Sequence, residues 1–212
     1  MDAAEELRPV RLFVAVDLDS ELRVRVADTA AHLAEALRPI AGASPRWVTT
    51  PNLHVTLRFI GEVAPERVWQ LEALVSAPLD GAPFHLELAG AGAFPASGAI
   101  RVLWLGVTRG EAELGSLASR LDARLRTAGV EAHDRPFRAH LTLARFRRPC
   151  AGRAARQVRA LLRTVGLVGT ARVERVTLYE SRLASAGPTY VARAEGRLGA
   201  RSERAEVAED AG

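Results

Sequence analysis

Two short segments of the chain share a pattern in which a threonine follows a histidine by two residues. The first starts at His54 and reads His-Val-Thr-Leu-Arg-Phe, and the second starts at His140 and reads His-Leu-Thr-Leu-Ala-Arg-Phe. The whole chain has only five histidines. A single histidine-threonine pair is common on half-exposed strands, because threonine favours strands. Two matching pairs favour a common role in one site.

Side chains at i and i+2 of a strand point to the same face. His54 and Thr56 therefore share one face, and Val55 and Leu57 share the other. The second motif repeats this arrangement from His140 onward. The apolar face of each strand can pack on a core, which leaves an imidazole and a hydroxyl side by side on the other face. We expect two similar lobes that each contribute one such strand to a shared cleft.

These residue types suit the cleavage of a phosphate ester. An imidazole has an ordinary pKa near 6.5 and can give or take a proton at neutral pH. One histidine can remove a proton from an attacking water, while the other protonates the departing oxygen on the opposite side of phosphorus. The hydroxyls of Thr56 and Thr142 can donate to the non-bridging phosphoryl oxygens, and nearby arginines can stabilise the charge that builds there. The pattern requires no metal and no cofactor.

Arginine is concentrated in the second half of the chain. All 29 basic residues are arginine, and nine of them lie between Arg135 and Arg163 without any Asp or Glu. A positive field of this kind attracts ligands that carry phosphate. A solvated charged surface explains the same run equally well.

The elements that must position the motifs follow from periodicity and from turn residues. Asp19 or Ser20 can cap the first helix, and Gly90 and Gly92 are predicted to end a strand. Helices are expected at about residues 20–38, 65–76, 111–127 and 153–163. Strands are expected at residues 12–16, 46–48, 53–60, 84–88, 102–107, 140–146, 172–179 and 190–196.

Several strand neighbours are joined by links too short for a parallel crossover, so antiparallel pairing is expected. The sequence therefore favours an α+β fold over a doubly wound parallel sheet. We expect one bilobal domain over residues 1–197 and a flexible tail over residues 198–212.

Composition adds that 48% of the residues are apolar and 25% are charged, as in an ordinary globular protein. No apolar run approaches the length needed to cross a bilayer. The acidic N-terminus has no apolar signal core, and Cys150 is the only cysteine. A cytoplasmic location and a monomer are expected.

The chain resembles the 2H phosphoesterase superfamily, and more closely the bacterial and archaeal RNA 2′,3′-cyclic phosphodiesterases, also called 2′–5′ RNA ligases. The resemblance runs from Arg11 to Gly196 and rests on the two motifs in their context. The matching segments are residues 11–16, 46–48, 52–61, 92–95, 102–106, 137–145 and 178–181. One departure is Ala139, where relatives usually have proline.

This resemblance implies a bilobal fold with two antiparallel sheets that flank an active-site groove, with helices outside. It implies hydrolysis of an RNA terminal 2′,3′-cyclic phosphate to a 2′-phosphate. His54 would protonate O3′, and His140 would position and deprotonate water. Thr56 and Thr142 would hold the phosphate together with Arg145. Strict alternation puts Arg145 on the face opposite His140, so it needs a bulge or a strand end to reach inward.

Two aromatic residues near the motifs, Trp47 and Phe137, could stack on an RNA base. Core packing is an equal alternative for each. Two other functions stay open at this stage. One is a physiological joining reaction that forms 2′–5′ linkages at the same site. The other is a non-catalytic RNA-binding module built on the arginine-rich stretch.

Overall fold

Strands and four α-helices are interspersed in the computed structural model, which describes residues 8–40, 44–131, 136–184 and 187–199. The helices are α1 (Ser20–Leu37), α2 (Val68–Ser76), α3 (Glu111–Arg126) and α4 (Gly152–Leu162), with 3-10 turns η1 (Thr50–Asn52) and η2 (Pro65–Arg67). The strands are β1 (Val10–Asp17), β2 (Pro45–Trp47), β3 (His54–Val63), β4 (Leu79–Asp80), β5 (Phe84–Phe94), β6 (Ile100–Arg109), β7 (His140–Cys150), β8 (Leu167–Val173), β9 (Arg175–Ala184) and β10 (Gly187–Gly199).

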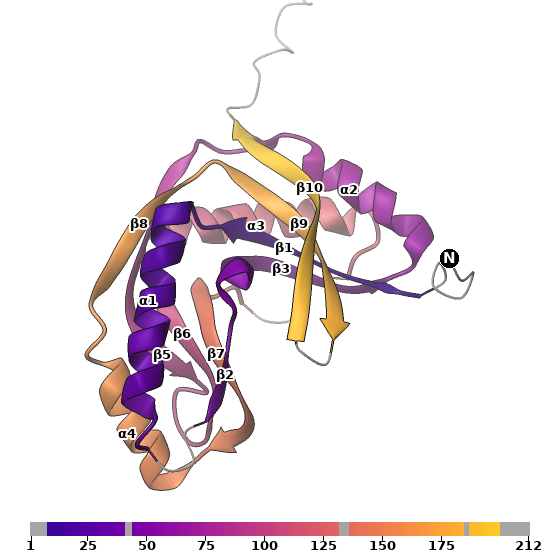
Figure 1. The fold of residues 1–212 in the computed structure, drawn as a ribbon. Coiled ribbons are helices and arrows are strands. Elements are labelled where there is room, and N and C mark those ends of the chain that lie inside the picture. Colours follow the sequence, from indigo (N-terminus) through magenta and orange to yellow (C-terminus); the bar gives the residue numbers. More distant parts are fainter. Residues whose placement is uncertain (1–7, 41–43, 132–135, 185–186, 200–212) are drawn as a thin grey trace, which may run out of the picture.

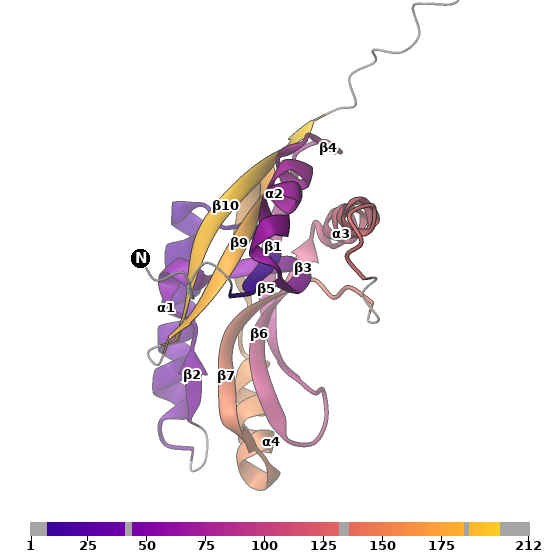
Figure 2. The ribbon, with the colours of Figure 1, turned by 90° about the vertical axis from the view of Figure 1, so that its right-hand side faces the viewer.

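The strands form two antiparallel halves that meet at an angle (Figure 1, Figure 2). One half has the order β10-β9-β1-β3, and the other has the order β8-β5-β6-β7. Backbone pairing between β3 and β7 joins the halves into one continuous sheet, in which β2 pairs with β7 and the short β4 runs parallel to β10. The structure confirms the predicted α+β class and its two antiparallel parts.

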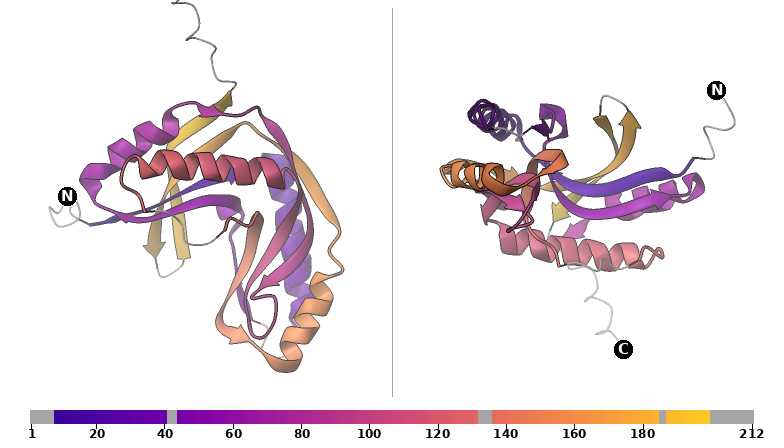
Figure 3. Two further views of the ribbon diagram at one scale, coloured as in Figure 1. Left: turned by 180° about the vertical axis from the view of Figure 1, so that it is seen from behind. Right: turned by 90° about the horizontal axis from the view of Figure 1, so that it is seen from below.

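The helices cover the outer faces in two pairs. Helices α2 and α3 contact each other and pack on the half that contains β3 and β10, whereas α1 and α4 pack on the half that contains β5 and β8 (Figure 3). Helix α1 follows β1 in the chain and α3 follows β6, so each of these helices packs on the half opposite to its preceding strand. Each half therefore packs against a helix that follows a strand of the other half.

Helix periodicity translates directly into burial. Asp19 caps α1 by accepting the backbone N–H of Leu22 at 2.8 Å, as the sequence predicts. The buried positions of α1 are Leu22, Val26, Leu33 and Leu37, and the leucine stripe of α3 is likewise buried at Leu114, Leu117, Leu121 and Leu125. The four-helix prediction is confirmed, with boundaries that differ by only a few residues.

The prediction that Gly90 and Gly92 end a strand is wrong. β5 continues through both glycines to Phe94. Gly90 has φ +66° beside a register shift between Ala89 and Ala91, which marks a bulge and not an end. Gly92 is needed because an added Cβ would collide with the indole of Trp104 on β6.

The predicted strand over residues 172–179 is in fact two strands that belong to different halves. β8 pairs with β5 and ends at Val173, whereas β9 starts at Arg175 and pairs with β1. β10 runs on to Gly199, beyond the expected domain end at residue 197, because Leu198 pairs with Leu79 and is only 8% exposed. Of the expected tail, residues 200–212 lie outside the described residues.

No helix in the described ranges is both long enough and apolar enough to traverse a lipid bilayer.

Candidate active site

His54 is the first residue of β3, and its ring forms hydrogen bonds with residues close to it in the chain. Its Nδ1 lies 2.7 Å from the carbonyl oxygen of Asn52, and its Nε2 lies 2.9 Å from Oγ1 of Thr56. Because a carbonyl can only accept, Nδ1 carries a proton in either charge state. In the neutral ring Nε2 accepts from the Thr56 hydroxyl, and in the protonated ring Nε2 donates to it. Only Nε2 of this ring can therefore change between accepting and donating a hydrogen bond.

The turn before His54 is fixed by an arginine from α1. Nη1 of Arg23 donates to the carbonyls of Thr50, Pro51 and Leu53 at 3.2, 3.2 and 3.3 Å, and Nη2 donates to the carbonyl of Leu18 at 3.1 Å. The Asn52 side chain adds a 2.7 Å hydrogen bond from Nδ2 to the carbonyl of Pro188 on β10. These contacts fix the carbonyl to which His54 is anchored.

His140 opens β7 in a matching way. Its Nδ1 lies 2.8 Å from the carbonyl oxygen of Arg138. Its Nε2 makes no hydrogen bond to any residue that the structure describes. The edge of the ring meets Phe94 with centroids 5.1 Å apart. A neutral His140 therefore holds its proton on Nδ1 and presents a free lone pair on Nε2.

The two motifs meet where the two halves of the sheet join. Val55 and Leu141 are antiparallel partners in β3 and β7. Extending this register by one residue in each direction puts His54 beside Thr142 and Thr56 beside His140. All four of these side chains lie on the face opposite to the buried Val55 and Leu141.

That face forms one wall of a cavity of about 580 Å³. His140, Thr142 and Arg145 line it from β7, and Thr56 and Phe59 line it from β3. His54 lies one hydrogen bond behind Thr56 and packs against the rings of Phe13 and Tyr190. The other lining residues are Leu57, Phe94, Pro95, Arg101, Val102, Pro136, Phe137 and Arg138.

A bulge brings Arg145 to the cavity side. Across β6 and β7, Trp104 pairs with Thr142 but Leu103 pairs with Ala144, so Leu143 is the extra residue. Leu143 and Ala144 are both buried, and alternation resumes with its phase reversed. Arg145 therefore points to the same side as His140. The sequence predicted that this residue would need such an irregularity.

The same bulge occurs in β3. Ala15 pairs with Thr56 and Val14 pairs with Arg58, which leaves Leu57 as the extra residue. This reversal brings Phe59 to the cavity, where it is 53% exposed. The sequence reasoning missed Phe59. The available signal was its place five residues after His54, as Arg145 is five residues after His140.

Burial is the largest cause that lowers the pKa of both histidines. The pKa of His54 is lowered from its ordinary 6.5 by burial, against opposing effects of the hydrogen bond to Asn52 and the charge of Asp17. The pKa of His140 is also lowered by burial, against its hydrogen bond to Arg138. The positive charge of Arg145 lowers both pKa values further. One arginine thus acts on both imidazoles.

Asp17 belongs to a polar group next to His54. It is the register partner of His54 across β1 and β3. Its two carboxylate oxygens accept hydrogen bonds from the hydroxyls of Thr177 and Tyr179, both at 2.7 Å. Burial and the contact with Asp17 together raise the pKa of Tyr179, so this phenol remains a donor.

The two aromatic residues predicted to stack on a base lie in different surroundings. Phe137 lines the cavity, as proposed from the sequence. Trp47 is half-buried, pairs in register with the buried Ala144 and packs against the hydrophobic core. It is not among the cavity-lining residues, and its packing agrees with the alternative that the sequence left open for it.

The arginines of the arginine-rich stretch lie in different surroundings. Arg138 and Arg145 are exposed and line the cavity, together with Arg101 from β6. Arg159 instead donates to the carbonyls of Pro95, Ala96 and Gly98, and so holds the loop that follows β5. Arg135 lies outside the described residues.

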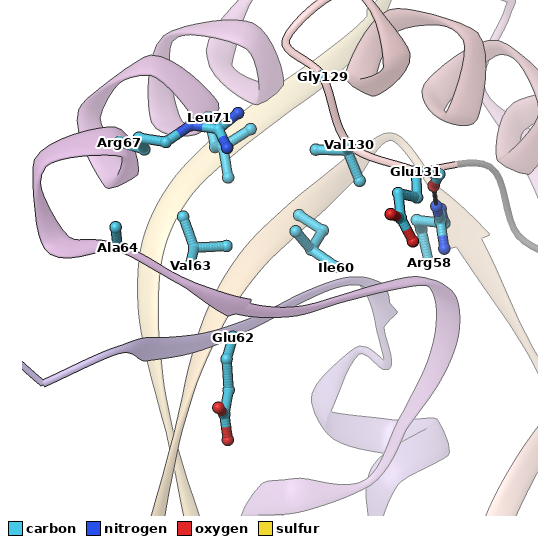
Figure 4. Close-up of a pocket in the computed structure, with 10 residues that line it drawn as sticks. All are labelled: Arg58, Ile60, Glu62, Val63, Ala64, Arg67, Leu71, Gly129, Val130 and Glu131. Atoms are coloured by element: carbon cyan, nitrogen blue, oxygen red, sulfur yellow. Dashed lines mark hydrogen bonds between the residues drawn. The ribbon is translucent and has the colours of Figure 1, made fainter.

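A second cavity of about 360 Å³ lies between β3, α2 and the segment after α3 (Figure 4). Its arginines are already engaged. Arg58 forms a 2.7 Å ion pair with Asp122 and donates to the carbonyl of Glu131, and Arg67 donates to the carbonyl of Ala128. None of the residues in the two histidine-threonine pairs lines it. It is distinct from the candidate active site.

Comparisons with known proteins agree with the motifs. The family model described as 2'-5' RNA ligase superfamily matches residues 26–184. An RNA 2′,3′-cyclic phosphodiesterase of Methanothermobacter thermautotrophicus is 36% identical over 182 residues, which cover 85% of this chain and 95% of that protein. The Archaeoglobus fulgidus protein of the same name is 39% identical over 140 residues, covering 66% and 74%.

Solved structures show the same likeness. A crystal structure titled phosphoesterase superposes with a TM-score of 0.68 at 29% identity, covering 90% of this chain and 98% of that one. Escherichia coli LigT complexed with 3'-AMP gives a TM-score of 0.66 at 29% identity, with the same coverage.

Proposed function

The chain belongs to the 2'-5' RNA ligase superfamily, and we propose that it hydrolyses the terminal 2′,3′-cyclic phosphate of RNA through His54 and His140. The relatives named RNA 2′,3′-cyclic phosphodiesterase support the activity. The observation that carries the assignment to residues is that Thr56, His140, Thr142 and Arg145 line one cavity, with His54 bonded to Thr56 at its wall.

In the proposed reaction, Nε2 of neutral His140 takes a proton from a water molecule as its oxygen attacks phosphorus. The P–O3′ bond breaks on the opposite side, and protonated His54 gives the Nε2 proton to O3′. The products are a 2′-phosphate and a free 3′-hydroxyl. Anchoring of each Nδ1 to a carbonyl leaves each Nε2 as the only nitrogen able to take part.

Charge builds on the non-bridging oxygens during the attack. The hydroxyls of Thr56 and Thr142 and the guanidinium of Arg145 can donate to these oxygens from the neighbouring strands β3 and β7. Arg145 is exposed and has no acidic partner among the described residues, so its charge is available for the substrate. Phe59 and Phe137 offer aromatic surfaces for the terminal base.

The mechanism that we propose uses neither a metal nor a cofactor. Two imidazoles, two hydroxyls and an arginine supply every proton transfer and every charge contact that this mechanism needs. We also propose a monomer, since one chain supplies all of these groups. A cytoplasmic location fits the single cysteine, Cys150, and an RNA substrate. Joining of RNA ends through a 2′–5′ linkage would use the same groups in reverse.

Product analysis tests the proposal. EDTA-treated protein is incubated with an oligonucleotide that ends in a 2′,3′-cyclic phosphate, and the product isomer is identified by chromatography against 2′- and 3′-phosphate standards. We expect the 2′-phosphate to form without added metal. A 3′-phosphate product, or activity that returns only with a divalent ion, would overturn the mechanism. Salt-sensitive RNA binding without any turnover would instead identify a binding module.

A further inference from the structure

Two arginines lie directly opposite each other beside the candidate active site. Arg46 on β2 and Arg145 on β7 are register partners in an antiparallel pair. Directly opposed residues extend their side chains from the same face of the sheet. Both arginines are exposed, while the adjacent partners Ala144 and Phe146 are buried on the other face. Arg46 therefore extends from the face that carries the cavity.

This pairing is unfavourable for the free protein. Like charges directly opposite each other on a sheet are destabilising. Neither guanidinium forms an ion pair or a hydrogen bond with any residue in the described ranges, whereas Arg25, Arg58 and Arg193 all have acidic partners. Two directly opposed arginines without acidic partners among the described residues favour the approach of an anion.

The two guanidiniums do not occupy the same place. Arg145 lines the cavity beside His140 and Thr142. Arg46 is not among the lining residues and lies one strand farther out, which is about 4.8 Å in a sheet. Its guanidinium lies against Gly187 at the start of β10, where an added Cβ would collide with Nη2 and would lie 3.1 Å from Cζ. Arg46 thus spans from β2 of one half toward β10 of the other.

We propose that Arg46 binds the phosphodiester on the 5′ side of the terminal nucleotide, while Arg145 contacts the cyclic phosphate. This assignment rests on the proposed function. The cyclic phosphate occupies O2′ and O3′ of the terminal ribose, so the only other phosphate of that nucleotide is attached at O5′. An arginine just outside the reaction cavity is placed for that second phosphate. Arg46 therefore makes the enzyme prefer an RNA chain to a free cyclic nucleotide.

A substrate pair that differs by one phosphodiester gives a direct test. The dinucleotide adenylyl-adenosine 2′,3′-cyclic phosphate is compared with adenosine 2′,3′-cyclic phosphate by kcat/KM. The enzymes are wild type, R46Q and the control R153Q, which removes an exposed arginine from the outer helix α4. We expect the dinucleotide-to-mononucleotide ratio to fall about tenfold in R46Q, as one charged contact is lost, and to keep its wild-type value in R153Q.

Binding separates this inference from the proposed function. Fluorescence anisotropy with short RNA that ends in a 2′-phosphate needs no turnover. In wild type and R153Q, the logarithm of the association constant should fall with the logarithm of salt concentration at one slope. In R46Q that slope should be smaller by about 0.7, the value for one phosphate contact on a single strand. This result would support the role of Arg46 even for a protein that failed to open cyclic phosphates.

Three outcomes would overturn the inference. One is an R46Q variant that matches R153Q in both the ratio and the salt slope. Another is an equal loss on both substrates at an unchanged melting temperature, which would put Arg46 on the terminal phosphate. The third is a drop in melting temperature with an equal loss on both substrates, which would give Arg46 a purely structural role between β2 and β10. R46K keeps the charge and should retain most of the salt slope.

Discussion

Val55 of β3 and Leu141 of β7 form the backbone pair at which the two halves of the sheet meet. Both side chains are fully buried, so their packing in the core fixes the position of this junction. The residues on each side of the pair are the histidines and threonines of the two motifs. An antiparallel junction of two similar strands makes the site nearly symmetric, with each histidine beside the threonine of the other motif.

Replacement of either motif histidine should abolish most activity. We expect H54A and H140A each to lower kcat by about 10² to 10⁴-fold, the usual contribution of a general acid or base. His85 is exposed on β5, outside the cavity lining, so H85A serves as a control with wild-type turnover. Steady-state assays on a 2′,3′-cyclic phosphate measure kcat, and melting curves verify that each variant is folded. Turnover above a tenth of wild type in either variant would contradict the assignment.

The pH dependence of kcat/KM should have a maximum below pH 6.5. The pKa values of both histidines are lowered by burial, so the protonated acid and the neutral base coexist at a lower pH than for free imidazoles. The charge of Asp17 raises the pKa of His54, so D17N should move the limb that reports His54 to lower pH. D28N, on the exposed side of α1, should leave the profile unchanged. A D17N limb that moves upward would refute this account.

Phe59 should contribute to binding more than to chemistry. Its ring lies on the cavity wall and is half exposed, as an aromatic platform for a base requires. Stacking on a base is worth about 1–3 kcal/mol, so F59A should raise KM about tenfold and leave kcat nearly unchanged. Trp69 is an exposed aromatic residue on α2, and W69A is the matched control. An equal KM for F59A and W69A would contradict the prediction that Phe59 stacks on a base.

Arg23 should act on the rate through the position of His54. The R23M variant loses the hydrogen bonds to the carbonyls of residues 50, 51 and 53. The turn that carries the Asn52 carbonyl, which accepts from Nδ1 of His54, should then be held less firmly. We expect kcat to fall about tenfold, as small misplacements of catalytic groups are costly, with little change in KM. R23K should recover only part of the rate, since it lacks the planar fork. Arg25, which pairs with Glu21 on the same helix, provides the control R25M. A change in KM alone would contradict this role.

The ion pair between Arg58 and Asp122 should matter for stability. Arg58 is only 6% exposed and pairs with Asp122 at 2.7 Å. Removal of one partner leaves a buried charge uncompensated, so D122A should lower the free energy of unfolding by about 3 kcal/mol. Urea denaturation of D122A against the exposed control D28A measures the difference. A loss below about 0.5 kcal/mol, typical of a surface pair, would show that the pair contributes little.

Much of the local structure could be predicted because it depends on short-range periodicity. The stripes of α1 and α3, the cap at Asp19 and the shared face of each histidine and threonine follow from spacings of two to four residues. The family resemblance came from the same two motifs. Glycine was less informative, since Gly92 marks the close approach of Trp104 and not the end of β5.

The sequence alone determined the two matching histidine-threonine pairs and that each histidine shares a strand face with its threonine. Only the tertiary structure decided that Val55 and Leu141 pair, that bulges turn Phe59 and Arg145 toward the cavity, and that Trp47 turns to the core beside Ala144. A strand's alternation is a property of its own backbone. A bulge and a strand partner are set by the neighbouring chain, which periodicity within one segment does not encode.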